Sequence, residues 1–232
     1  RYVYSALTGT NQILVIDGLA DSPAAVARIN VPFGTPRSIA LTPDLSRLYM
    51  TIGATNAVGI FDAVTFQPID ADPSTTDIDP IRLPNGASSF WAAAGSANDF
   101  LFVTDDRVGQ IYVVDIRPGR ATYHHVVQTA VATPAPSGLR GIAVDADGTR
   151  VYAAAPDSVM FGTGGRSRAG QILVFDIHPE AASAILTSAA AILAGNEPYG
   201  VSAGVNPGQI VFANRLTDSD HKPGAKPPLS RS

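Results

Sequence analysis

The chain has 232 residues and a net charge of −4; 45% of the residues are hydrophobic and 16% are charged. This composition suits a packed core and argues against disorder, and the charge gives no reason to expect nucleic acid as a partner. The absence of cysteine excludes disulfide bonds, thiol nucleophiles and thiolate zinc sites. The apolar runs are far shorter than the roughly 20 residues that span a bilayer, so no membrane span is expected.

The chain opens in strand-like sequence without a signal peptide, so we expect that a signal was removed or that the sequence begins inside a longer one. Its first segment, YVYSA (2–6), is an aromatic-centred run that recurs along the chain, and we call it strand b. The recurrences are RLYMT (47–51), FLFVT (100–104), RVYAA (150–154) and, near the end, QIVFAN (209–214).

A second pattern, an apolar alternation that ends in Asp, follows strand b, and we call it strand c. It occurs as QILVID (12–17), AVGIFD (57–62), QIYVVD (110–115) and QILVFD (171–176). The strand-b aromatic precedes this Asp by 13 residues in Tyr4–Asp17, Tyr49–Asp62 and Phe102–Asp115, and by 24 in Tyr152–Asp176. The constant offset indicates a structural repeat rather than a chance resemblance.

Two further strands complete the repeat. A small, apolar strand a precedes strand b by 10 or 11 residues, as RSIALTP, FWAAAG, RGIAVD and YGVSAG. A looser strand d follows strand c, as in AAVARINV (24–31) and HHVVQTAV (124–131). In the Ala-rich stretch 181–194 a helix is the main alternative to a strand.

Four short strands in each repeat, at intervals of roughly 45 to 60 residues, are typical of β-propeller blades. The sequence therefore predicts an all-β fold, a β-propeller of four-stranded antiparallel blades, over the single region 1–232. The small residues of strand a suit the crowded innermost position, and the strand-b aromatics suit the wider space between blades. The expected blade portions, about three whole and two partial, are 1–35, 36–87, 88–137, 138–196 and 197–232.

The two partial blades do not complement each other, because both would supply strand b. The 13-residue offset from Phe212 reaches Ala225, inside the turn-rich HKPGAKPPLSRS, where no strand signal exists. We therefore expect the chain to be a section of a longer propeller, or to be completed by a partner chain. An open sheet edge would otherwise promote aggregation.

Two stretches carry a resemblance to a known family. PRSIALTPDLSRLYMTIGATNAVGIFDA (36–63) and RGIAVDADGTRVYAAA (140–155) resemble the YVTN-type repeat of bacterial and archaeal propellers. This family includes surface-layer and other cell-surface proteins as well as seven-bladed lactonase-like enzymes, so the resemblance implies two function classes. The chain departs from the family pattern in lacking the Asn after Y-V-T, except at Asn214.

The face that carries the d–a and b–c connections is where we expect a site, because loops on a rigid scaffold carry function. The fourth b–c loop, within 156–170, is long, and so is the one after Asn214; such loops are either functional or disordered. The candidate ligand-binding residues at the starts of strands a and on the long loop are Arg37, Ser89, Arg140, Tyr199, Arg166 and Arg168. Converging guanidinium groups suit a carboxylate or phosphate, whereas the alternative is that each Arg pairs with an Asp of a neighbouring blade.

Other motifs favour structural roles. Asp145-Ala-Asp147-Gly148 begins like a calcium loop but lacks the later ligands, and it aligns with an ordinary hairpin turn. His124 and His125 fall in a predicted strand, where adjacent rings face opposite ways and cannot chelate one ion together. We predict no catalytic residue, no metal site and no cofactor.

Two functions remain open beside a third possibility, a redox subunit that uses the propeller as a scaffold; without Cys the chain has no attached c-type haem. The first is a non-catalytic binding or structural module of a bacterial extracytoplasmic protein (periplasmic, secreted or on the cell surface), with a protein or a small anionic ligand as partner. The alternative is a lactonase-like hydrolase acting on a sugar lactone or related ester, which would need a general base or a metal at the channel mouth.

Overall fold

The computed structural model describes residues 2–53, 55–132, 136–161 and 167–215, and the side chains of 157–169 are not among those described. The described residues form five antiparallel sheets, of three, four, four, four and two strands. The first sheet contains β1 (Tyr2–Leu7), β2 (Gln12–Asp17) and β3 (Ala24–Asn30). The second contains β4 (Pro36–Leu41), β5 (Arg47–Ile52), β6 (Ala57–Asp62) and β7 (Ile81–Arg82).

The remaining sheets follow the same order of strands. The third contains β8 (Ser89–Ala94), β9 (Phe100–Asp105), β10 (Gln110–Asp115) and β11 (Val126–Val131). The fourth contains β12 (Ile142–Val144), β13 (Arg150–Phe161), β14 (Ser167–Ile177) and β15 (Leu186–Gly195). The fifth contains β16 (Pro198–Ala203) and β17 (Ile210–Asn214). The predicted three whole and two partial four-stranded units are confirmed. The alternative of a helix over 181–194 is wrong, because residues 181–185 form no regular element and β15 occupies the rest of that stretch.

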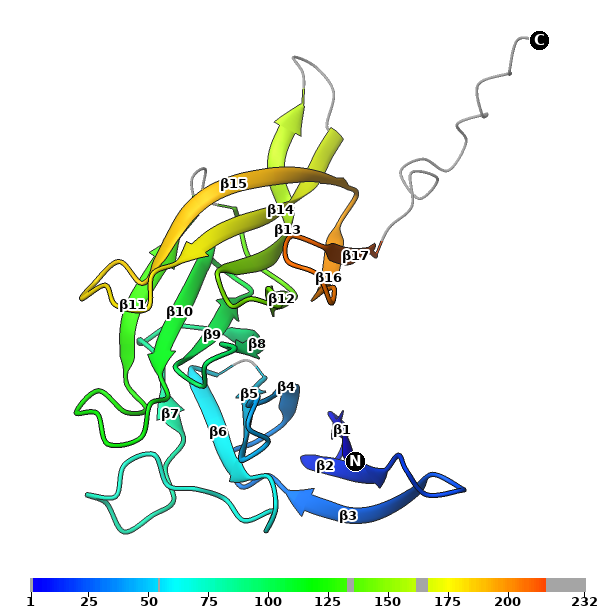
Figure 1. Ribbon diagram of the computed structural model, residues 1–232, viewed down its shortest axis with the longest axis vertical. Helices are drawn as coiled ribbons and strands as arrows, with labels where there is room; N and C mark the ends of the chain where they lie inside the picture. The colour runs from blue at the N-terminus through cyan, green and yellow to red at the C-terminus, as the bar shows by residue number, and fades with distance from the viewer. Residues whose placement is uncertain (1, 54, 133–135, 162–166, 216–232) are drawn as a thin grey trace.

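The five sheets follow one another around an arc that is open between β1 and the β16–β17 pair (Figure 1). The innermost strands line the inside of the arc, where β4 contacts β8, β8 contacts β12, and β12 contacts β16. No helix that is long and apolar enough to cross a membrane occurs among the described residues.

Each pair of adjacent sheets encloses its own hydrophobic core. Residues of the first two sheets enclose one cluster, residues of the second and third another, and residues of the third and fourth the largest. A smaller cluster of the fourth sheet packs against Val201 and Ile210 of the fifth. A sheet in the middle of the arc is therefore buried on both faces, as stacking of two-faced sheets requires.

The strand register explains the small and aromatic repeats. Small residues of the innermost strands lie opposite the strand-b aromatics, in the pairs Ala40–Tyr49, Ala93–Phe102 and Ala143–Tyr152. Paired residues share one face of a sheet, so a small residue leaves room for each ring. In the fifth sheet the corresponding pair is Ser202–Val211, so the alignment of Phe212 with the other aromatics is wrong by one residue.

Three of the four Asp residues that end strand c, Asp17, Asp62 and Asp115, cap the turns that follow, as Asp commonly does, whereas Asp176 pairs with Arg150. Asp62 accepts hydrogen bonds from the backbone N–H groups of Val64 and Thr65. Asp115 is fully buried and accepts two hydrogen bonds from the Arg117 guanidinium. Burial alone would raise the pKa of Asp115, but the hydrogen bonds from Arg117 and Thr122 lower it to about 2.

Two local expectations are corrected. Most of the predicted loop 156–170 is an extended hairpin, because β13 continues to Phe161 and pairs with β14 as far as Ser167. His124 and His125 lie in the turn before β11, not in a strand. The turn at Asp145 is confirmed as a hairpin turn, since the Gly148 N–H donates to the Asp145 carbonyl.

His124 is buried, with a left-handed backbone (φ 62°), and its Nε2 lies 3.2 Å from the Tyr49 hydroxyl. Burial, reinforced by the positive charge of Arg47, lowers its pKa from 6.5 to about 4. The unfolded chain therefore binds a proton more strongly than the folded chain between these pH values, and the free energy of unfolding falls as the pH drops from 6.5 to 4.

We expect this loss to be on the order of 2–3 kcal/mol. His124→Asn should flatten the slope between pH 6.5 and 4, because Asn tolerates the left-handed backbone but does not titrate. Urea unfolding at a series of pH values measures this slope of the free energy of unfolding for both proteins. An equal slope in the variant would show that other groups cause the loss; acid loss due to Asp115 falls in a lower pH range.

Candidate functional site

The starts of the innermost strands and the end of β9 meet on the inside of the arc. Arg37 is the second residue of β4, Arg140 precedes β12, and Asp106 follows β9. Together with Phe90 of β8 and Tyr199 of β16 they form what we call the mouth cluster. Its members come from four sheets, although they are far apart in the sequence.

Two guanidinium groups of the mouth cluster lie against one aromatic ring. The guanidinium carbon of Arg37 lies 4.5 Å from the Phe90 ring centroid, and that of Arg140 lies 5.0 Å from it. Both distances are within the range of cation–π attraction. The aromatic ring thus holds together two like charges that would otherwise repel each other.

The two guanidinium groups differ in their partners. Arg37 Nη1 donates to Asp106 Oδ2 at 2.9 Å, an ion pair in which the side chains are 34% and 19% exposed. Arg140 Nη1 donates to the backbone carbonyl oxygens of Asp106 and Leu139, each at 3.1 Å. Within the described part of the chain, no carboxylate lies within ion-pair distance of Arg140. Pairing with an Asp of a neighbouring sheet therefore holds for Arg37 and not for Arg140.

The neighbouring carboxylate of Asp105 fixes the backbone at this point. Asp105 is fully buried and accepts hydrogen bonds from the backbone N–H groups of Ser88, Arg107 and Val108. It also accepts a hydrogen bond from the Tyr112 hydroxyl at 2.9 Å. Burial, together with this bond, raises the pKa of Tyr112, so its hydroxyl remains a donor. Asp105 thereby holds the chain in the position from which the next residue reaches Arg37.

Tyr199 adds an aromatic wall to the mouth cluster. Its ring meets Phe90 edge-on at a centroid distance of 5.8 Å, and it meets Trp91 at 6.4 Å. Its backbone carbonyl accepts a hydrogen bond from the Gly141 N–H at 2.8 Å, which links β16 to the fourth sheet. A Cβ at Gly141 would lie 2.8 Å from that oxygen, so the strands approach too closely there for any other residue.

Three predicted site residues do not contribute described side chains to the mouth cluster. Ser89 is fully buried, and its hydroxyl lies near the carbonyl oxygens of Ile52, Thr55 and Ala57 in the second sheet. It therefore links two sheets. Arg166 lies outside the described residues, and Arg168 pairs with Met160 in the extended hairpin.

Asp106 is the candidate site residue that sequence reasoning missed. It lies after strand b rather than at the start of strand a, so the matched positions did not include it. Its Oδ1 is buried and accepts no hydrogen bond from any described residue, while Oδ2 pairs with Arg37. Two guanidinium groups and one carboxylate leave the mouth cluster with one uncompensated positive charge, which suits an anion.

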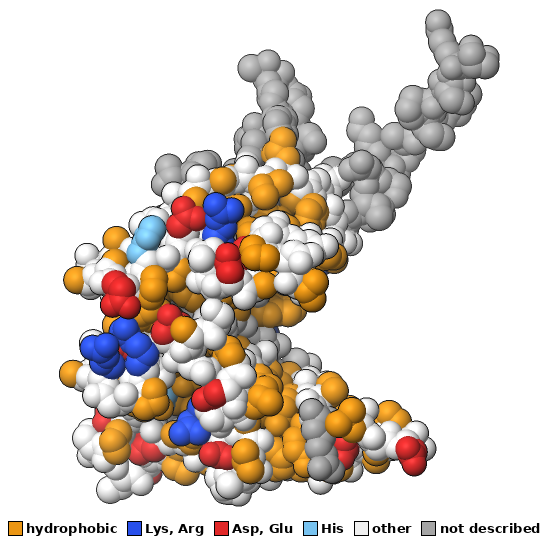
Figure 2. All heavy atoms as spheres, viewed as in Figure 1, with side chains coloured by type: hydrophobic (Ala, Val, Ile, Leu, Met, Phe, Trp, Pro, Cys, Tyr) orange, Lys and Arg blue, Asp and Glu red, His pale blue; other side chains and the backbone are white. Residues whose placement is uncertain are grey.

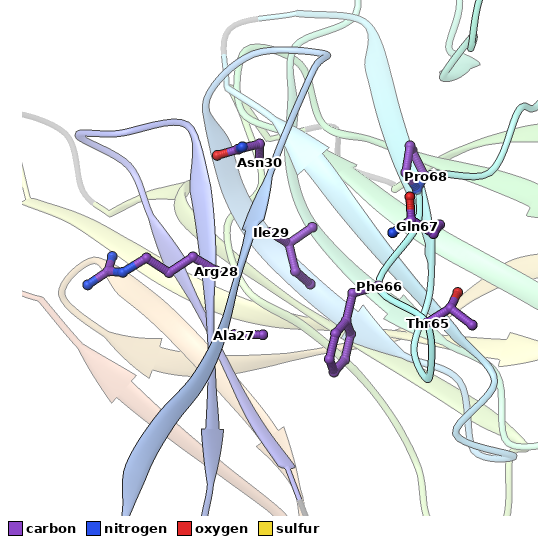
Figure 3. Close-up of a pocket in the computed structure, with 8 residues that line it drawn as sticks. All are labelled: Ala27, Arg28, Ile29, Asn30, Thr65, Phe66, Gln67 and Pro68. Atoms are coloured by element: carbon purple, nitrogen blue, oxygen red, sulfur yellow. The ribbon is translucent and has the colours of Figure 1, made fainter.

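A groove elsewhere on the molecule has fewer charged side chains than the mouth cluster. A groove of about 400 Å³ lies between β3 and residues 65–68 (Figure 3). Ile29 points across it toward Phe66, whereas Arg28, its one charged lining residue, points to the other side of β3 (Figure 3). No group of three or more His, Asp or Glu side chains that could hold a metal ion occurs in the described ranges.

Comparisons with known proteins relate the fold of the chain to solved structures. No family model and no curated protein matches the sequence. A protein of unknown function from Desulfotomaculum acetoxidans is 12% identical with a TM-score of 0.70, over 92% of this chain and 59% of that one. A proposed 6-phosphogluconolactonase from Bacteroides uniformis is 17% identical with a TM-score of 0.68, over 93% of this chain and 61% of that one.

A third match identifies the architecture by its printed description. The β-propeller domain of a protein from Myceliophteria thermophila has a TM-score of 0.59 at 12% identity, over 92% of this chain and 63% of that one. The chain thus spans about three-fifths of the length of these structures. At such low identities the matches establish the fold alone. The chain has an all-β fold of β-propeller type, built from four-stranded antiparallel blades.

Proposed function

We propose that the chain is a non-catalytic binding module that holds an anionic group, a carboxylate or a phosphate, at the mouth cluster. The observation that carries this proposal is the unequal pairing of its two guanidinium groups. Arg37 has a carboxylate partner, whereas among the described residues the Arg140 guanidinium donates only to carbonyl oxygens and lies 5.0 Å from the same aromatic ring. An anion that contacts both would complete the charge balance and could accept paired hydrogen bonds.

Isothermal titration with inorganic phosphate and with citrate tests the proposal. We expect measurable binding that weakens with added salt, and a loss of at least about 10-fold in affinity in an Arg37→Ala/Arg140→Ala double variant. Arg82→Ala is the matched control, because Arg82 is on an outer strand, 64% exposed and paired with Asp79. Equal affinity of the double variant and the control would refute anion binding at the mouth cluster.

A second candidate function rests on Asp106. A carboxylate with one buried, unpartnered oxygen beside two guanidinium groups suits a lactonase-like hydrolase. Asp106 would take a proton from a water molecule as the water oxygen attacks the ester carbonyl, and Arg140 would stabilise the oxyanion. The ring C–O bond would then break, and the leaving oxygen would take up a proton.

Hydrolysis of glucono-δ-lactone distinguishes the two candidates. The binding module predicts no hydrolysis above the uncatalysed rate, with phosphate binding intact. The hydrolase predicts turnover that Asp106→Asn lowers by at least about 100-fold. The extracytoplasmic bacterial location remains a prediction from the sequence resemblance, and fractionation of the source cells would test it.

A further inference from the structure

The two ends of the arc expose positions that every middle sheet buries. The strand-b residue opposite the small strand-a residue is Tyr49, Phe102 or Tyr152 in the middle sheets, and these are 1%, 0% and 3% exposed. Each is covered by the sheet that follows. The equivalent residue of the fifth sheet, Val211, is 66% exposed.

The first sheet shows the same contrast on its opposite face. One residue earlier in strand b lie Leu48, Leu101 and Val151, which are each 0% exposed because the preceding sheet covers them. Their equivalent in β1 is Val3, which pairs with Ile16 and is 54% exposed. Both terminal sheets therefore present the apolar face that stacks against another sheet everywhere else in the chain.

The edges of the terminal sheets are also incomplete. Among the described strands, β17 forms a sheet ladder only with β16, and β1 forms one only with β2. In the middle sheets the corresponding strand has a neighbour on each side. The opening lies between these two sheets, and hydrophobic side chains border it on both arms (Figures 1 and 2). Open strand edges and exposed apolar faces are features that closed β-proteins avoid.

The size of the opening follows from the solved structures. Those single chains are matched over 59–61% of their length by this one. The 17 strands of the described residues, at three-fifths of the length, scale to about 28 strands, or seven blades of four. One strand is needed inside β1 and two outside β17, which leaves two whole blades for the opening.

We propose that the opening is filled by further four-stranded blades of the same polypeptide, which cover Val3 on one side and Val211 on the other. The first added strand pairs antiparallel with β17. We assign the added blades to the same polypeptide because each matched chain extends about two-fifths of its own length beyond the matched part. This proposal concerns the ring and holds whether or not the mouth cluster binds an anion.

The first test is the mass of the polypeptide in its source cells, detected with an antibody raised against the folded chain. We expect a band of about 40 kDa, since 24.1 kDa corresponds to 59–61% of the matched length. A band at 24.1 kDa would overturn the proposal, even if a separate protein co-purified with it, because the occupant would then be another chain.

The second test places a charge in the proposed interfaces. Val211→Asp and Val3→Asp should leave the melting temperature of the 232-residue chain nearly unchanged but lower that of the longer polypeptide by roughly 5 °C or more. Leu45→Asp, at a turn residue that is 60% exposed, is the control and should change neither. Tolerance of Val211→Asp in the longer polypeptide would contradict the proposed contact.

Discussion

Replacement of Asp105 by alanine is expected to lower the free energy of unfolding by about 3–5 kcal/mol, because four donors, two of them in buried hydrogen bonds, lose their acceptor at once. The donors are the Tyr112 hydroxyl and the N–H groups of Ser88, Arg107 and Val108, at 2.8–3.1 Å from the carboxylate oxygens. Water cannot replace the carboxylate without entering a fully buried position. Urea unfolding followed by circular dichroism gives the difference directly.

The matched variant is Asp105→Asn, which keeps one acceptor oxygen and nearly the same volume. Asp105→Asn should lower the free energy of unfolding by clearly less than the alanine variant does. Some loss should remain, because only one end of the amide group can accept hydrogen bonds. If both variants unfold at the urea concentration of the unaltered chain, the carboxylate does not hold this junction together. If the alanine variant loses much stability, we also expect it to bind anions more weakly, because the segment that Asp105 fixes also positions Asp106.

Replacement of Phe175 by alanine should also cost about 3–5 kcal/mol, through lost burial and the cavity that remains. Phe175 is fully buried (0% exposed) in the cluster between the third and fourth sheets, where it lies with Phe100 and Phe102. Phe212→Ala makes the same chemical change at a ring that is 37% exposed in the fifth sheet. We expect less than about 1.5 kcal/mol there, because much of that ring already contacts water.

Thermal or urea unfolding of the two variants compares sheet packing in the middle of the arc and at its end. The difference between them should exceed about 1.5 kcal/mol. Equal losses would mean that the fifth sheet is packed as firmly as the middle ones, and the exposed faces at the opening would then need another explanation.

Much of the fold could be predicted from the sequence, because each strand carries local information. The alternation of strand c fixes which residues face each core, and the terminal Asp marks a turn that it caps itself, as at Asp62. The constant spacing then places four strands in one sheet. The strand register was harder to predict. Phe212 was aligned with the other strand-b residues because it is aromatic, but strand pairing places Val211 opposite Ser202.

The site could be predicted only in part, because its residues meet through the stacking of sheets. Arg37 and Arg140 were found from equivalent positions at the starts of strands a, and the structure places both against Phe90. Asp106 has no counterpart in the repeat pattern, and its approach to Arg37 spans 69 residues of sequence. Ser89 shows the opposite difficulty, since its position was equivalent but its side chain turns into the neighbouring sheet.

The most direct test of the account is a phosphate titration that follows the side-chain N–H signals of individual arginines by nuclear magnetic resonance. The signals are assigned with single Arg→Lys variants. The account predicts a saturable shift of the Arg140 and Arg37 signals, while the exposed Arg82 signal stays nearly still. If Arg82 shifts as much as Arg140, phosphate has no site at the mouth cluster, and the proposed function is wrong.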